Sequence, residues 1–241
     1  MIKATLMLLV GASTMLMSAA KQGKLTFYWV SDEKRDSGNG PLNTQLYSVK
    51  GKPIKKVTRK FAEKIRMEGT GRLSDGRLLN VWDRSKCNYN TNDFACFKDI
   101  SSSSEWGVGN KGNNLVPYVS VASNTIPHGK TVEIKQLIGM PLPGTNNLKH
   151  NGCFRVDDEC GSCTTKQHVF DFFAAREQYY PPIEEKLAKH RVDGGSKVLL
   201  DYDVKPCKIL NYPIPKPNLL MGAEEPHYML GAQELEGGFM N

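Results

Sequence analysis

The amino-acid sequence predicts a mainly-β protein built around a small closed barrel. Short alternating or β-branched runs recur along the chain, glycine-rich turns separate them, and few segments show a helical pattern. Many short strands with little helix favour a barrel, which leaves no exposed sheet edge and offers a groove at its mouth for an extended ligand. No internal repeat is visible, so we expect one domain with additions.

The strand candidates follow one another along the chain with polar or glycine-rich connections. Residues 24–30 alternate and are aromatic, 45–49 and 53–57 have the pattern of a hairpin, and 67–82 contains short strands with a turn at 74–76. The remaining strand candidates are residues 115–122, 130–137, 153–156, 168–172, 197–204 and 207–210.

Few helices are expected, and all of them are short. Residues 58–65 suit one or two helical turns with Thr58 as the N-cap, and residues 173–180 can start another helix. Residues 32–43 and 83–114 are polar loops, and two cysteines in the second loop indicate a cross-link.

The first 20 residues have the pattern of a secretory signal peptide. Lys3 provides a positive charge, residues 6–17 form an apolar run, and residues 18–20 are small, as a cleavage site requires. The apolar run is too short to span a bilayer comfortably, although a retained membrane anchor is the alternative. We therefore expect a secreted protein, extracellular or periplasmic, with no stable membrane insertion after cleavage.

The expected organisation has four parts. A signal peptide covers residues 1–20, N-terminal strands that pack on the barrel cover 21–66, and the barrel covers 67–210. An irregular C-terminal tail, extended or disordered, covers 211–241, because that segment is rich in proline, glycine and methionine.

The formal net charge is +7, and much of the positive excess lies in residues 50–72. A basic surface suits an anionic polymer. Since exported proteins rarely meet nucleic acid, we expect a bacterial wall or acidic polysaccharide as the partner, no nucleic acid, and a monomer. Solvated lysines on an exposed face are an equally good explanation.

Six cysteines follow the signal peptide, and an even number in an exported chain indicates structural disulfides. Cys160 and Cys163 form a C-x-x-C pair, for which a redox site or half of a zinc site is the alternative. No second C-x-x-C is present, and the histidines show no metal-ligand spacing, so neither a metal nor another cofactor is expected.

The stretch 152–175 carries the strongest signal for chemistry. It contains the pair Asp157 and Asp158 and a further acid, Asp171, within an apolar run. An acid among apolar side chains tends toward a raised pKa, which a general acid needs near neutral pH. Neighbouring acids of this kind are the minimum equipment for cleaving a glycosidic bond.

Residues 122–132 (ASNTIPHGKTV) and the aspartate-rich stretch resemble the three-aspartate domain of membrane-bound lytic transglycosylase A and rare-lipoprotein-A-like proteins. Residues 67–73, 106–109 and 115–118 look like segments that accompany this domain. The pattern D-x-C, C, H-x-x-D in 158–171 is similar to that of expansins and family-45 endoglucanases.

The resemblance covers roughly residues 67–175 and implies a six-stranded double-psi β-barrel. It also implies cleavage of cell-wall glycan, with a peptidoglycan lytic transglycosylase preferred. The alternatives are a non-catalytic expansin- or barwin-like module that binds polysaccharide, and a glycoside hydrolase that acts on cellulose or chitin.

The same resemblance assigns catalytic roles. Asp171 matches the family's general acid and base, and Asp158 matches a second aspartate, with Asp157 as the off-by-one alternative. The family's first aspartate has no counterpart here: the matching region, residues 122–124, reads Ala-Ser-Asn.

Other side chains are weaker candidates for catalysis or substrate binding. Glu68 or Asp75 can supply a second acid, although Asp75 also suits a plain turn. His168 lies three residues before Asp171, on the opposite face of a regular strand. The side chains expected to contact sugar are Thr70, Arg72 and Trp106, the last as the tryptophan expected to be most exposed.

Overall fold

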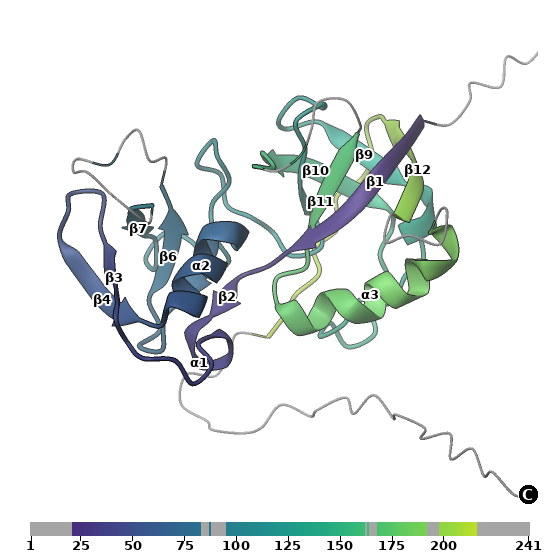
Figure 1. The fold of residues 1–241 in the computed structure, drawn as a ribbon. Helices are drawn as coiled ribbons and strands as arrows, with labels where there is room; N and C mark the ends of the chain where they lie inside the picture. The colour runs from purple at the N-terminus through teal and green to yellow at the C-terminus, as the bar shows by residue number, and fades with distance from the viewer. Residues whose placement is uncertain are drawn as a thin grey trace, which may run out of the picture.

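The computed structural model describes residues 21–82, 87, 95–161, 163, 168–191 and 198–215, and this part of the chain is mainly β (Figure 1). The predicted signal peptide and residues 216–241 of the predicted tail lie outside the described residues. No helix within the described ranges is both long enough and apolar enough to cross a bilayer.

Six strands close into a barrel in the order β1-β11-β8-β10-β9-β12. Two pairings, β1 with β11 and β10 with β8, are parallel, and the other four are antiparallel. The strands are β1 Lys21–Tyr28, β8 Ser120–Ala122, β9 Thr131–Ile134, β10 Cys153–Asp158, β11 Val169–Phe173 and β12 Val198–Val204.

The inside of the barrel is apolar. Residues that pair across neighbouring strands place their side chains on one face of the sheet. One such row contains Phe172, Val121 and Val156, and a second contains Phe154 and Val132. All five side chains are almost fully buried, so this face forms the core and the alternate residues point outward.

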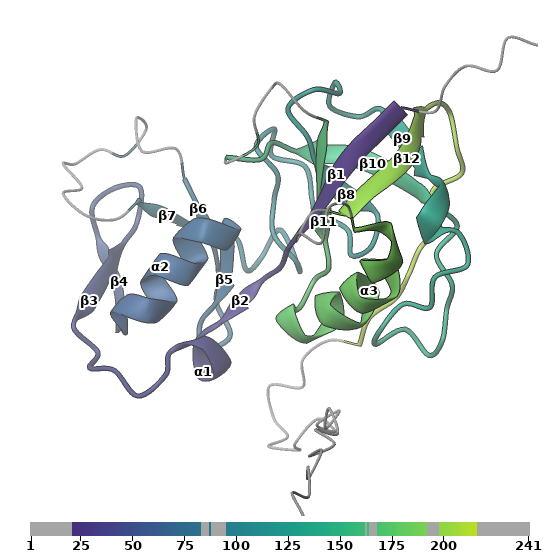
Figure 2. The ribbon, with the colours of Figure 1, turned by 45° about the vertical axis from the view of Figure 1, so that its right-hand side comes forward.

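A second lobe, residues 31–99, lies beside the barrel, and β1 leads into it through β2 (Figures 1 and 2). It has its own core around Phe61, Ile65 and Phe97. Its elements are β2 Ser31–Asp32, α1 Glu33–Asp36, β3 Thr44–Tyr47, β4 Pro53–Val57, α2 Arg59–Glu68, β5 Thr70–Arg72, β6 Leu78–Val81 and β7 Phe97–Asp99. The strands pair as a sheet β2-β5-β6-β7 and a hairpin β3-β4.

This arrangement differs from the expected boundary at residue 67. β1 is a barrel strand that pairs with both β11 and β12. In contrast, β5 pairs with β2, β6 with β5 and β7 with β6, and none of these three pairs with a barrel strand. The reason is physical: alternation along a strand shows that one of its faces is buried, but not which sheet it joins.

The predicted hairpin and the predicted helix in the second lobe are both present. The hydroxyl of Thr58 accepts a 3.3 Å hydrogen bond from the backbone N–H of Phe61 and caps α2. The helix ends at Gly69, whose φ of 81° is the left-handed conformation that favours glycine.

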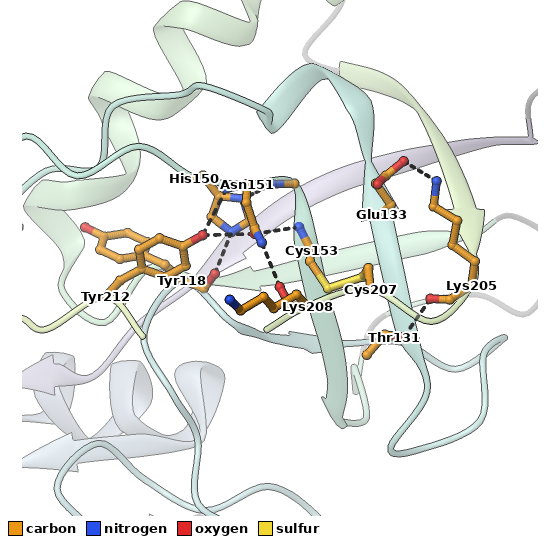
Figure 3. Close-up of a disulfide and its surroundings, with 11 residues drawn as sticks. Tyr118, Thr131, Glu133, His150, Asn151, Cys153, Lys205, Cys207, Lys208 and Tyr212 are labelled. Carbon is orange, nitrogen blue, oxygen red and sulfur yellow. Dashed lines mark hydrogen bonds and ion pairs between the residues drawn. A yellow bond between two sulfur atoms is a disulfide. The ribbon is translucent and has the colours of Figure 1, made fainter. Parts of the chain in front are cut away.

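Two predicted strands differ from the structure. Only the last three residues of 115–122 pair as β8, because Pro117 lacks an N–H and Tyr118 has a φ of 61°. The predicted strand 207–210 is irregular: its Lys208 carbonyl accepts a 2.7 Å hydrogen bond from the Asn151 side chain instead of joining a ladder (Figure 3).

The helical segments after β11 complete the fold. A helix is expected to start within residues 173–180. In the structure, a 3-10 turn covers Glu177–Tyr179, and α3 follows it as Tyr180–Leu187. Ile183 and Leu187 of α3 are buried in the barrel core cluster. Two further 3-10 turns in the described part of the chain are Lys135–Leu137 and Ala188–His190.

The prediction of disulfides is confirmed. The bonds are Cys87–Cys96, Cys153–Cys207 and Cys160–Cys163. Cys153–Cys207 joins β10 to the segment after β12 (Figure 3). Beside it, Nε2 of His150 donates to the Tyr118 carbonyl at 2.7 Å, and burial lowers the pKa of this histidine to about 4. His150 is therefore a neutral part of the core.

Candidate active site

Asp158 and Asp171 lie on either side of Ala122. In β8, Ala122 pairs with Asp171 of β11 on one side and with Asp158 of β10 on the other. Neighbouring strands are about 4.8 Å apart, so the two aspartate Cα atoms are separated by roughly 10 Å. This row alternates with the buried core rows, so both carboxyls point outward from the barrel wall.

A β-bulge in β10 decides which of the two adjacent aspartates takes this position. The register shifts between Val156 and Asp158, so Asp157 is the extra residue and Asp158 pairs with Ala122. Asp157 is buried, forms an ion pair with Arg155 at 2.6 Å and accepts a 2.5 Å hydrogen bond from the Ser120 hydroxyl. The structure therefore gives Asp157 a structural role.

Asp171 is held by a neighbour on β1. The Thr26 hydroxyl donates a 2.8 Å hydrogen bond to Oδ1 of Asp171, its partner in the parallel pairing of β1 with β11. Burial raises the pKa of Asp171 to about 6, and the Thr26 hydrogen bond opposes this by favouring the charged form. The other carboxyl oxygen, Oδ2, has no hydrogen bond to a described residue.

Asp158 is held by backbone groups. The N–H groups of Asn110 and Glu159 each donate a 2.9 Å hydrogen bond to its Oδ1. Burial raises its pKa to about 6, the two hydrogen bonds lower it, and the charges of Glu159 and Asp171 raise it further. With two N–H donors, Asp158 is the member of the pair better suited to carry the negative charge.

The second lobe contributes Glu68, the last residue of α2. Its carboxyl is buried, and Oε2 accepts a 3.3 Å hydrogen bond from the backbone N–H of Trp29, just after β1. Burial raises the pKa of Glu68 to about 8, and the negative charge of Asp171 adds to this effect. Glu68 and Asp171 therefore interact electrostatically, although they come from different lobes.

The loop after β7 joins the second lobe to the aspartates. The Asn80 side chain donates to the Val108 carbonyl at 3.2 Å and accepts a 2.7 Å hydrogen bond from the Thr70 hydroxyl. Gly109 lies against the Asp157 backbone, where a Cβ would overlap the carbonyl oxygen. Asn110, the next residue, donates to Asp158. This loop therefore sets the position of one of the two Asp158 donors.

Two of the side chains expected to bind sugar are internal. Thr70 is 2% exposed and is bonded to Asn80. The expectation that Trp106 is exposed is wrong: it is 8% exposed and packs in the barrel core cluster, with the Arg176 guanidinium 5.9 Å from its ring. The glycines around Trp106 indicated an open loop, but they allow close packing instead.

Three further candidates make their described contacts away from the acids. Arg72 donates to the Glu105 carbonyl at 2.9 Å, and Asp75 bonds Arg77 within its turn. His168 is exposed, and its Nδ1 is 2.8 Å from the Thr125 hydroxyl.

Sequence reasoning did not identify Thr26, Asn110 or Tyr28 as parts of this site. Tyr28 lies two residues after Thr26 on the same face of β1, and its hydroxyl is buried without a hydrogen-bond partner among the described residues. Burial, and then the charges of Asp158 and Asp171, raise the pKa of Tyr28. The alternation of residues 24–30 predicts that one face of this strand is buried, but it does not indicate that Asp158 and Asp171 lie near that face.

Comparison with known proteins gives a structural likeness only. No family model matches the chain, and no curated protein matches it. Among solved structures, the chain is similar to E. coli MltA with bound chitohexaose, at 14% identity and a TM-score of 0.43, covering 77% of this chain and 72% of that one. A second structure of MltA from E. coli gives 13% identity and a TM-score of 0.39, with 76% and 72% covered.

Proposed function

We propose that this protein cleaves a β-1,4-linked glycan, preferably peptidoglycan, by acid–base catalysis at Asp171, as a lytic transglycosylase does. The observation that carries this proposal is the placement of Asp171 and Asp158 on either side of Ala122, both partly exposed on the outer wall and both with a pKa raised to about 6. Two neighbouring carboxyls, one protonated so that it can act as the acid and the other charged, are the arrangement that acid-catalysed glycan cleavage requires.

The roles follow from the hydrogen bonds. Thr26 occupies Oδ1 of Asp171, so Oδ2 holds the proton that is given to the glycosidic oxygen. The C1–O bond breaks, its electron pair stays with the leaving oxygen, and Asp171 becomes a carboxylate. Asp158 stays charged on its two N–H donors and favours the positive charge that develops at C1.

The carboxylate of Asp171 then accepts a proton from the hydroxyl that attacks C1. If this is the sugar's own 6-hydroxyl, the product is a 1,6-anhydro sugar and Asp171 regains its proton. If it is water, the product is a reducing sugar. Either route restores the starting state of the enzyme.

The finer architecture and the location belong to the same proposal. The two parallel pairings within a closed six-stranded ring support a double-psi barrel. Three disulfides support a secreted protein in an oxidising compartment, extracellular or periplasmic.

The test uses purified sacculi, cellulose and chitin, with the soluble products analysed by mass spectrometry. We expect 1,6-anhydro-muropeptides from sacculi, and a loss of about 10²- to 10⁴-fold in Asp171→Asn with unchanged thermal unfolding. Asp203→Asn, a half-buried acid on β12 that pairs with Lys135, is the matched control. Full activity in Asp171→Asn contradicts the assignment, and tight pelleting with an unchanged polymer indicates a binding module instead.

A further inference from the structure

Four acids in the described part of the chain are less than 10% exposed, and Glu68 differs from the other three. Each of those three has a cation within 3 Å, whereas Glu68 makes no ion pair with a described residue. The paired acids and their cations are Glu33 with Lys55, Asp36 with Arg35, and Asp157 with Arg155. An unpaired buried carboxyl is expensive unless it holds a proton, so its retention here points to a use.

The position of Glu68 explains how it keeps a proton. It ends α2, where the partial negative charge of the helix C-terminus disfavours a carboxylate. Its contact to the Trp29 N–H uses Oε2 only. Trp29 directly follows β1, and β1 carries Thr26, which bonds Asp171. The short segment from Thr26 to Trp29 therefore forms a hydrogen bond with each of the two carboxyls.

The charged groups that face Glu68 come from three elements. Asp171 of β11 and Glu177 of the 3-10 turn before α3 disfavour its ionisation, and Lys64 of α2 favours it. The Lys64 ammonium, however, lies 2.6 Å from Glu177 and 3.7 Å from Asp36. Burial is the main cause of the raised pKa of Glu68, and the charge of Lys64, which these acids largely balance, opposes it only in part.

We propose that Glu68 donates the proton to the leaving group of the glycan and that Asp171 accepts the proton of the attacking hydroxyl. This inference rests on the proposed function and divides between two carboxyls the two proton transfers assigned above to Asp171 alone. Glu68 gives its proton to the glycosidic oxygen as the C1–O bond breaks, and the electron pair of that bond stays with the leaving oxygen. Asp171 takes the proton of the hydroxyl that attacks C1. Asp171 then releases this proton to solvent, and Glu68 takes up a proton from solvent, which restores the starting state of both carboxyls.

The first test compares two leaving groups. Glu68→Gln keeps the size of the side chain and an acceptor for the Trp29 N–H. We expect this variant to lose at least about 100-fold on sacculi, but less than about 10-fold on an aryl chitooligosaccharide, whose phenolate leaves without a proton. Asp171→Asn should lose activity on both substrates. The matched control is Glu63→Gln, an exposed acid on the same helix that pairs with Arg59.

The second test is the pH profile of the wild-type protein. A donor at Glu68 and an acceptor at Asp171 predict a bell, rising through about pH 6 and falling through about pH 8. Glu68→Gln should lose the alkaline limb. If Asp171 acts alone as the acid, activity instead declines as pH rises through about 6.

The outcomes separate the two proposals. Wild-type activity in Glu68→Gln, or an equal loss on both substrates, overturns the role of Glu68 while leaving glycan cleavage intact. A wild-type protein that releases nothing from sacculi, cellulose or chitin overturns the proposed function and the donor role together.

Discussion

The Thr26 hydroxyl bonds Oδ1 of Asp171 at 2.8 Å, although 145 residues separate the two along the chain. The bond fixes one carboxyl oxygen and favours the charged form, because a hydroxyl donates to a carboxylate. The orientation of the candidate acid thus depends on the first strand of the barrel.

Replacing Thr26 with valine should raise the pKa of Asp171 above its present value of about 6, since only the opposing effect of burial remains. A carboxyl-carbon NMR titration measures this directly, without any assumption about the substrate. Thr26→Ser keeps the donor and should restore the titration of the wild-type protein. An unchanged titration in Thr26→Val would show that the hydrogen bond has no effect on ionisation.

The neighbouring acids Asp157 and Asp158 should respond in opposite ways to the same change. Asp158→Asn keeps an oxygen for the two N–H donors, so we expect a loss of activity of about 10-fold or more with little change in stability. Asp157→Asn leaves Arg155 without its buried partner and should cost about 3 kcal/mol of stability. Urea unfolding and product release, measured on both variants, check this contrast, and a reversed pattern would contradict the bulge assignment.

Gly109→Ala should reduce activity through the loop and not through the acids themselves. The new Cβ overlaps the Asp157 carbonyl, so the loop must shift and carry the Asn110 N–H away from Asp158. We expect a loss of about 10-fold or more in product release. Gly161→Ala, where a Cβ meets nothing within 4 Å, is the control and should behave as the wild type.

Glu68 should lower the stability of the folded protein as pH rises. Its pKa is about 8 in the fold, against 4.5 for an unperturbed glutamate, so the unfolded chain loses the proton first. The free energy of unfolding is unaffected by Glu68 ionisation below about pH 4.5, and it decreases as the pH rises from there to about 8. Glu68→Gln should therefore be more stable than the wild type by an amount that grows from pH 5 to pH 9, to on the order of a few kcal/mol. Thermal unfolding across this range checks it, and a difference independent of pH would contradict a protonated Glu68.

The disulfides should differ in their contribution to stability. Cys153–Cys207 closes a separation of 54 residues and should be worth roughly 4 kcal/mol, whereas Cys160–Cys163 closes a separation of 3 and should be worth roughly 2 kcal/mol. Double serine variants of each pair, compared by denaturant unfolding without reductant, measure the difference. Equal losses would indicate that local packing around Tyr212 and His150, and not the cross-link, secures the C-terminal segment.

Sequence reasoning succeeded where the deciding interactions are local. The Thr58 cap, the hairpin 44–57 and the turn at Asp75 depend on neighbours within a few residues, and the structure contains all three. The aspartates of 152–175 were identified because an acid within an apolar run is unusual wherever it lies.

It failed where the deciding partner is distant. Nothing near Thr26 indicates Asp171, and nothing near β5 indicates that it joins β2 and not the barrel. The choice between Asp157 and Asp158 depended on a single bulged residue, which alternation does not reveal. Glycines beside Trp106 are compatible with an open loop and with close packing of the tryptophan. The amino-acid composition of the loop therefore does not predict whether Trp106 is exposed.

The place of β1 has a consequence for the order of folding. β1 pairs with two strands near the other end of the described chain, and a contact such as Gln22 with Asp201 spans 179 residues. The ring therefore stays open until β12 has been synthesised, and such high contact order predicts slow closure. The strand pairs and the separate core of the second lobe lie within residues 31–99, so this lobe can form first, as an inserted unit. Its early assembly would hold β1 in place as a template for the later strands.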